Sequence, residues 1–141
     1  LRELSAAGIP TAVMIAPVIP GLTDNEIPAI LQAAREAGAH HASWVMLRLP
    51  HAVKSIFEDW LDRARPLRKQ KVLSLVRSMR RGRLYDAQPG RRMRGEGPYA
   101  GHVERLFETT CRRLGYHASR VALSTAAFRR PGGQMSLFDT T

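Results

Sequence analysis

Cysteine is almost absent from this sequence, in which Cys111 is the only example among 141 residues. A single cysteine cannot form a disulfide within the chain, and low cysteine content is typical of proteins from a reducing compartment. We therefore expect a cytoplasmic location.

Long hydrophobic runs are also missing. No apolar run approaches the roughly 18 residues that span a bilayer, and nothing has the form of a signal peptide. We therefore expect no membrane partner. Hydrophobic residues still make up 44% of the chain, which is enough for a globular domain with its own core.

Acidic residues are scarce, with 12 Asp and Glu against 22 Lys and Arg, so the formal net charge is +10. This imbalance predicts attraction to an anionic partner such as nucleic acid, a phosphorylated ligand or an anionic surface. The charge alone does not distinguish among these partners.

The first third of the sequence has the pattern of a parallel α/β fold. Residues 11–16 and 42–47 are short apolar runs of strand length, which we expect to be buried on both faces. Residues 17–22 are too rich in proline for a central strand or a helix. Thr23 and Glu26 have the spacing of a capping box that would begin the intervening helix. Alternating strands and helices of this kind predict a parallel sheet.

The rest of the chain is predicted to be a helical extension. Its expected helices cover residues 53–65, 67–81 and 99–114, and a loop rich in Gly, Pro and Arg covers residues 83–98. We divide the chain into 1–51, 52–116 and a tail at 117–141. Because residues 1–8 look like the last turns of a helix already under way, we interpret the start as a cut in a longer protein.

Several short motifs occur in an order that resembles the later barrel strands of radical S-adenosylmethionine (SAM) proteins, nearest the spore-photoproduct-lyase-like branch. These motifs are Gly8-Ile9-Pro10, Ala16-Pro17-Val18-Ile19-Pro20-Gly21-Leu22-Thr23-Asp24, Ala37-Gly38-Ala39 and Leu47-Arg48-Leu49-Pro50. The resemblance continues further along the sequence, so it covers most of the chain. The residues concerned are Phe57, Trp60-Leu61, Lys71-Val72, Arg81-Gly82, Tyr85, Gly95, Gly97 and Tyr99-Ala100.

This resemblance implies the C-terminal portion of a partial (β/α) TIM-like barrel, followed by the helical extension. It also implies a [4Fe–4S] cluster that cleaves SAM to a radical, with DNA or a nucleotide among the candidate substrates. The family holds its cluster on a CxxxCxxC-type motif, and cysteine thiolates are the usual ligands of such clusters. Cys111 alone cannot hold one. We therefore expect the motif upstream and expect the fragment itself to be inactive.

The same resemblance implies a cofactor site on two loops. Residues beside SAM would be Pro17, Val18, Ile19, Pro20 and Gly21, together with Arg48, whose guanidinium suits a carboxylate or phosphate. Two alternatives remain open. The first loop could be a turn made rigid by two prolines, and Arg48 could form a structural salt bridge.

A run of basic residues predicts contact with nucleic acid through phosphate groups, and Tyr85 and Tyr99 could stack on bases. The alternative is a solvated helix face whose acidic partners lie elsewhere. A non-catalytic nucleic-acid-binding module is therefore our second functional hypothesis. The candidate residues are Arg68, Lys69, Arg77, Arg80, Arg81, Arg83, Arg91, Arg92 and Arg94.

The tail contains Gln134-Met135-Ser136-Leu137-Phe138, which resembles the peptide by which bacterial replication and repair proteins dock on the sliding clamp. Gln134, Leu137 and Phe138 would make the contacts. The alternative is a tail that packs on its own domain.

No metal site is expected, because the adjacent His40 and His41 would point to opposite sides of a strand.

Overall fold

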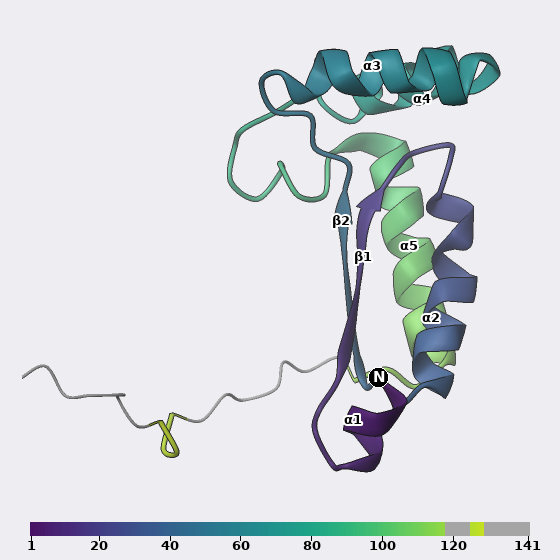
Figure 1. The fold of residues 1–141 in the computed structure, drawn as a ribbon. Helices are drawn as coiled ribbons and strands as arrows, with labels where there is room; N and C mark the ends of the chain where they lie inside the picture. Colours follow the sequence, from purple (N-terminus) through teal and green to yellow (C-terminus); the bar gives the residue numbers. More distant parts are fainter. Residues whose placement is uncertain (118–124, 129–141) are drawn as a thin grey trace, which may run out of the picture.

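The computed structural model describes residues 1–117 and 125–128. The elements follow one another as in Figure 1. The chain order is α1 (Arg2–Ala6), β1 (Ala12–Val18), the 3₁₀ helix η1 (Asp24–Glu26), α2 (Ile27–Glu36), β2 (His41–Met46), α3 (Val53–Ala64), α4 (Pro66–Ser78) and α5 (Gly97–Arg113). The prediction of a mixed α/β chain followed by helices is confirmed, whereas the TIM-like barrel stays a prediction.

Strands β1 and β2 pair in parallel and are joined through α2, as the sequence pattern predicts. Ala12 lies opposite His41 and Ile15 opposite Trp44, and the register shifts between Ile15 and Val18. Pro17 lies within this irregular stretch, where a residue without an N–H is tolerated. The expected break at Pro17 is therefore wrong, because β1 continues to Val18.

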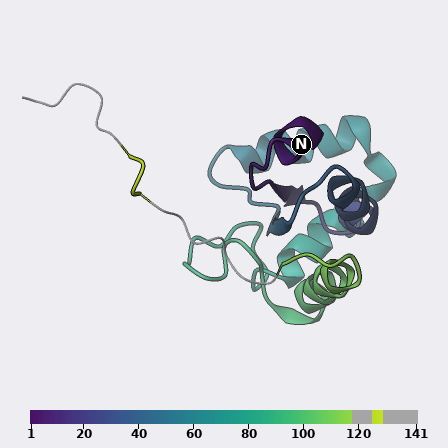
Figure 2. The same cartoon turned by 90° about the horizontal axis from the view of Figure 1, so that it is seen from below.

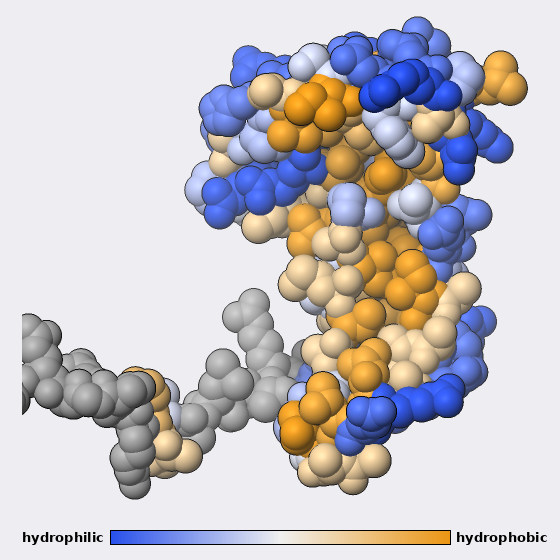
Figure 3. Space-filling view, in the orientation of Figure 1, coloured by the Kyte–Doolittle hydropathy of each residue, from blue (hydrophilic) through white to orange (hydrophobic). Residues whose placement is uncertain are grey.

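Helices α2 and α5 cover the same face of the sheet (Figures 1 and 2). Their buried side chains pack with Ile15 and Trp44 of the strands in one core. The opposite face of β1 is open, and Met14 on it is 65% exposed. The expectation that β1 is buried on both faces is therefore wrong within the part of the chain that the structure describes. In Figure 3, hydrophobic side chains gather over this middle part of the molecule.

Helix α2 begins without the predicted capping box. The Thr23 hydroxyl instead accepts a hydrogen bond from the Ile19 backbone N–H at 2.9 Å, and no side chain caps η1 or α2. A Thr hydroxyl can accept a backbone N–H in a turn as well as at a helix cap. In this structure the Thr23 hydroxyl is used in the turn and is therefore not available as a cap.

Helices α3 and α4 lie across the carboxyl ends of the strands (Figure 1). They form a second core with residues that leave β2, and Ile19 and Leu22 from the loop after β1 pack against it. The buried members are Leu47, Leu49, Leu61, Val72, Leu73 and Val76. The three helices expected in the extension are confirmed, with slightly different bounds.

The segment between α4 and α5 returns to the sheet. The Met46 N–H donates to the Met93 carbonyl at 2.8 Å, and the N–H of Leu47, just after β2, donates to the Val18 carbonyl at 2.9 Å. Successive N–H groups of a strand point to opposite edges, so Met93 covers the edge of β2 away from β1. At the amino end of β2, the His117 N–H donates to the His40 carbonyl at 2.9 Å.

Across residues 1–117 and 125–128, no helix has the length and apolar character to cross a bilayer.

Candidate functional site

The loop after β1 is packed against α4. Val18 and Pro20 are fully buried. Gly21 has a φ of +72°, and a Cβ at this position would lie 2.8 Å from the Leu75 Cδ1 atom. The sequence predicts that Gly21 permits close approach of a ligand. The close neighbour observed is a side chain of α4.

Asp24 and Tyr99 fasten this loop. The Asp24 carboxylate accepts hydrogen bonds from the Gly21 N–H at 3.1 Å and from the Tyr99 hydroxyl. Burial, with a smaller contribution from the hydrogen bond and charge of Asp24, raises the pKa of Tyr99 to about 12. The phenol therefore keeps its proton and remains a donor at neutral pH. The structure thus reveals a role for Asp24 that the sequence analysis did not predict, since the capping box was assigned to Thr23 and Glu26.

Arg48 follows β2 at the same end of the sheet as the loop after β1, as the parallel topology predicts. Its Nη1 atom lies 3.8 Å from the Met93 sulfur, which is a weak contact. Its Nε atom is buried without a hydrogen-bond partner, and Arg48 forms no ion pair with the residues described. The alternative of a structural salt bridge finds no partner in residues 1–117 or 125–128.

Arg80 differs from the sequence-based expectation of a surface contact. It is only 1% exposed, and its Nη2 atom donates to the Leu47 carbonyl at 2.7 Å and to the Arg92 carbonyl at 3.3 Å. Burial lowers its pKa, as does the nearby charge of Arg48, while Asp86 raises it. Arg80 therefore links the loop after α4 to the end of β2 and is not part of the exposed basic surface.

The other eight predicted nucleic-acid contacts fall into two groups. Lys69 pairs with Asp62, Arg91 lies 3.3 Å from both Asp86 and Glu96, and Arg94 lies over the Trp44 ring at 4.2 Å from its centroid. These three are half-buried. The exposed group is Arg68, Arg77, Arg81, Arg83 and Arg92.

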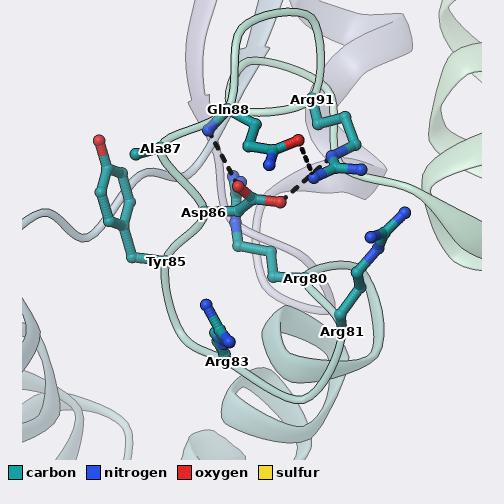
Figure 4. Close-up of a pocket in the computed structure, with 8 residues that line it drawn as sticks. All are labelled: Arg80, Arg81, Arg83, Tyr85, Asp86, Ala87, Gln88 and Arg91. Atoms are coloured by element: carbon teal, nitrogen blue, oxygen red, sulfur yellow. Dashed lines mark hydrogen bonds and ion pairs between the residues drawn. The ribbon is translucent and has the colours of Figure 1, made fainter.

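A pocket of about 470 Å³ opens within the loop between α4 and α5. Figure 4 shows its side chains coming from one continuous stretch of chain. We call it the arginine pocket. Its lining residues are Arg80, Arg81, Arg83, Tyr85, Asp86, Ala87, Gln88 and Arg91.

A turn that begins at Asp86 forms one wall of the arginine pocket. The Asp86 Oδ1 atom accepts from the Gln88 N–H at 2.9 Å, and Arg91 donates to the Gln88 side-chain oxygen. The pKa of Asp86 is lowered, first by the Gln88 N–H and then by Arg91, Arg80 and Arg81. Sequence reasoning missed this turn, although an Asp two residues before its bonded N–H is a recognised turn signal.

The residues present do not fit an iron–sulfur cluster. No group of three or more His, Cys, Asp or Glu side chains within the described ranges could hold a metal ion. Burial, and to a smaller extent Glu108, raises the pKa of Cys111 to about 11, so its thiol is protonated at neutral pH. Thiolates are the ligands such clusters need.

The predicted clamp-docking residues Gln134, Leu137 and Phe138 lie outside the described residues. Comparisons of the chain with protein-family models, with curated proteins and with solved structures find no match.

Proposed function

We propose that this chain is the C-terminal part of a radical SAM enzyme and contributes two neighbouring strands to its barrel. One observation carries the structural side of this proposal. The parallel pair β1 and β2 is covered by helices on one face and is open on the other, where Met14 is 65% exposed. Barrel strands pack one face on outer helices and the other on the barrel interior.

The family resemblance supports the same proposal from the sequence. Its two loop motifs, at residues 16–24 and 47–50, follow β1 and β2 at the carboxyl ends of the strands. Active sites of (β/α) barrels are built from loops at this end. Arg48 belongs to one of these motifs, and its partly buried guanidinium suits a carboxylate such as that of SAM. The cluster ligands would come from another part of the protein, so this chain alone would not be active.

The complete reading frame and its product test the proposal. We expect a CxxxCxxC-type motif upstream of Leu1, and we expect iron and formation of 5′-deoxyadenosine from SAM when the full-length protein is purified without oxygen. The isolated chain, treated identically, is the control and should hold no cluster. A frame that starts just before Leu1 without such cysteines would refute the proposal, as would a full-length protein without iron.

A second candidate function is nucleic-acid binding, which the exposed arginines of α4 and the loop after it favour. Arg68 and Arg77 lie on α4, and Arg81, Arg83 and Arg92 follow it. Of these five, only Arg81 forms an ion pair with a described residue, Glu96. A cluster of unpaired guanidinium groups is suited to phosphates.

A salt titration tests this second function. Binding of the chain to short DNA strands and duplexes should weaken steeply as salt rises, because phosphate contacts release counterions. Binding that is absent at low salt, or that does not change with salt, would contradict nucleic-acid binding.

Docking of the tail on a sliding clamp is tested separately. Removal of residues 134–141 should abolish binding to a bacterial sliding clamp, and unchanged binding would eliminate that partner.

A further inference from the structure

We propose that the arginine pocket holds one phosphodiester group of a single nucleic-acid strand, with Tyr85 against the adjoining base. This inference rests on the second candidate function and gives it a defined site.

The charge of the pocket favours an anion. Arg80, Arg81, Arg83 and Arg91 line it, and Asp86 is the only acidic side chain in the lining. Both Asp86 oxygens already have partners, the Gln88 N–H and Arg91. Glu96 lies outside the lining and interacts with Arg81 and Arg91. The two acidic groups therefore leave the charges of Arg80 and Arg83 without a direct carboxylate partner among the described residues.

Arg80 supplies the strongest sign of a ligand. It lines the pocket and is 99% buried, since only 1% of its surface is exposed. Its Nε and Nη1 atoms have no hydrogen-bond partner. Buried donors without partners are rare in folded proteins and call for a ligand or an ion. An anion in the pocket would offset the charge of Arg80 from one side, while the Leu47 carbonyl holds it from the other.

The remaining lining groups suit a nucleotide better than a bare anion. Arg83 is exposed, and its side chain makes no hydrogen bond or ion pair with the described residues, so it is free to meet a phosphate oxygen. Tyr85 adds a half-exposed aromatic ring beside it. Base stacking on an aromatic side chain, next to a cationic group for the phosphate, is the usual way single strands are bound without sequence preference. The volume of about 470 Å³ falls in the range of small-molecule sites.

The test is a salt titration of binding to a fluorescent single-stranded DNA of about eight nucleotides, which matches the footprint of one small binding domain. Arg83→Ala and Tyr85→Ala are compared with Arg113→Ala, which removes an exposed charge at the far end of α5. All three positions lie at the surface or half-exposed, so the variants should fold, and circular dichroism verifies this.

We expect Arg83→Ala to weaken binding about fivefold or more and to reduce the slope of log affinity against log salt by about 0.7, the value for one phosphate of a single strand. Tyr85→Ala should weaken binding without changing the slope. Arg113→Ala should change neither by much. If all three variants bind like the parent chain, the pocket inference is wrong while general nucleic-acid binding stands. If the parent chain itself does not bind, the second candidate function fails as well.

Discussion

The Tyr99 hydroxyl donates a hydrogen bond to the Asp24 carboxylate and so ties the first turn of α5 to the loop after β1. The two residues are 75 positions apart in the sequence. The same carboxylate oxygen accepts the Gly21 N–H at 3.1 Å, so one side chain orders both the loop and its neighbouring helix. The shape of the loop after β1 therefore depends on a residue in the helical extension.

Tyr99→Phe should lower the free energy of unfolding by about 1 kcal/mol, the net value of a hydrogen bond in a partly exposed setting. Urea-induced unfolding monitored by circular dichroism measures the change. Tyr85→Phe is the matched control, because the Tyr85 hydroxyl has no hydrogen-bond partner among the described residues. Equal losses in the two variants would show that the bond to Asp24 contributes nothing.

The same hydroxyl should make stability sensitive to alkaline pH. The pKa of Tyr99 is raised from 10.0 to about 12 in the folded chain, so the folded state holds this proton more tightly than the unfolded state. Its contribution is complete below pH 10 and is lost as the pH rises toward 12. Cys111 and Tyr116, whose pKa values are also raised, add to the decline. Tyr99→Phe should reduce the decline, and an unchanged pH profile of unfolding would contradict the assignment.

Gly21→Ala should destabilise the chain more than Gly8→Ala. Both glycines have positive φ, at +72° and +75°, so both variants carry the backbone cost of about 1 kcal/mol. Only at Gly21 would the new Cβ meet another atom, Leu75 Cδ1 at 2.8 Å, because nothing lies within 4 Å of the same position at Gly8. We expect an extra loss of about 1 kcal/mol from this contact. Equal unfolding midpoints for the two variants would show that the Leu75 side chain moves away from the new Cβ without loss of stability.

Arg80→Ala should lower the free energy of unfolding by about 2–3 kcal/mol, since the Leu47 and Arg92 carbonyls lose a donor and the core gains a void. Arg77→Ala is the control, because it removes an exposed arginine from the preceding turn of the chain. Thermal unfolding compares the two. A loss no larger than that of the control would mean that Arg80 does not hold the loop to β2.

Arg94→Ala should cost about 1 kcal/mol, which is typical of a cation over an aromatic ring in a partly desolvated site. The Arg94 guanidinium lies 4.2 Å from the centroid of the Trp44 ring, so the emission of this buried tryptophan should also shift. Arg92→Ala removes a neighbouring exposed charge and should leave the emission unchanged. Identical spectra for both variants would contradict the contact.

Local patterns predicted well which segments are helices and which are strands. The spacing of apolar residues within one segment indicates which of its side chains are buried, and this spacing differs between helices and strands. The parallel pairing of β1 and β2 followed from the strand, helix, strand order. The pattern failed at Thr23 and at Pro17. At both positions the backbone has a second acceptable arrangement, a turn bonded to Ile19 and an irregular strand, and only the surrounding contacts choose between them.

The candidate site was predictable in composition and less so in arrangement. The sequence identified the arginines and Tyr85, because charge and residue type are visible without a structure. It could not show that Arg80 turns inward to the end of β2, since nothing local separates it from Arg81, whose side chain is exposed. Burial of this charged side chain depends on the carbonyls of Leu47, 33 positions away, and of Arg92, 12 positions away.

The hydrogen bond from the His117 N–H to the His40 carbonyl places His117 beside the start of β2. His40 directly precedes β2, whereas the arginine pocket adjoins the opposite end of that strand. Six residues of strand separate the two by about 20 Å. A fluorophore attached at residue 117 would therefore lie well away from Arg83, which makes this position suitable for labelling the protein in binding measurements.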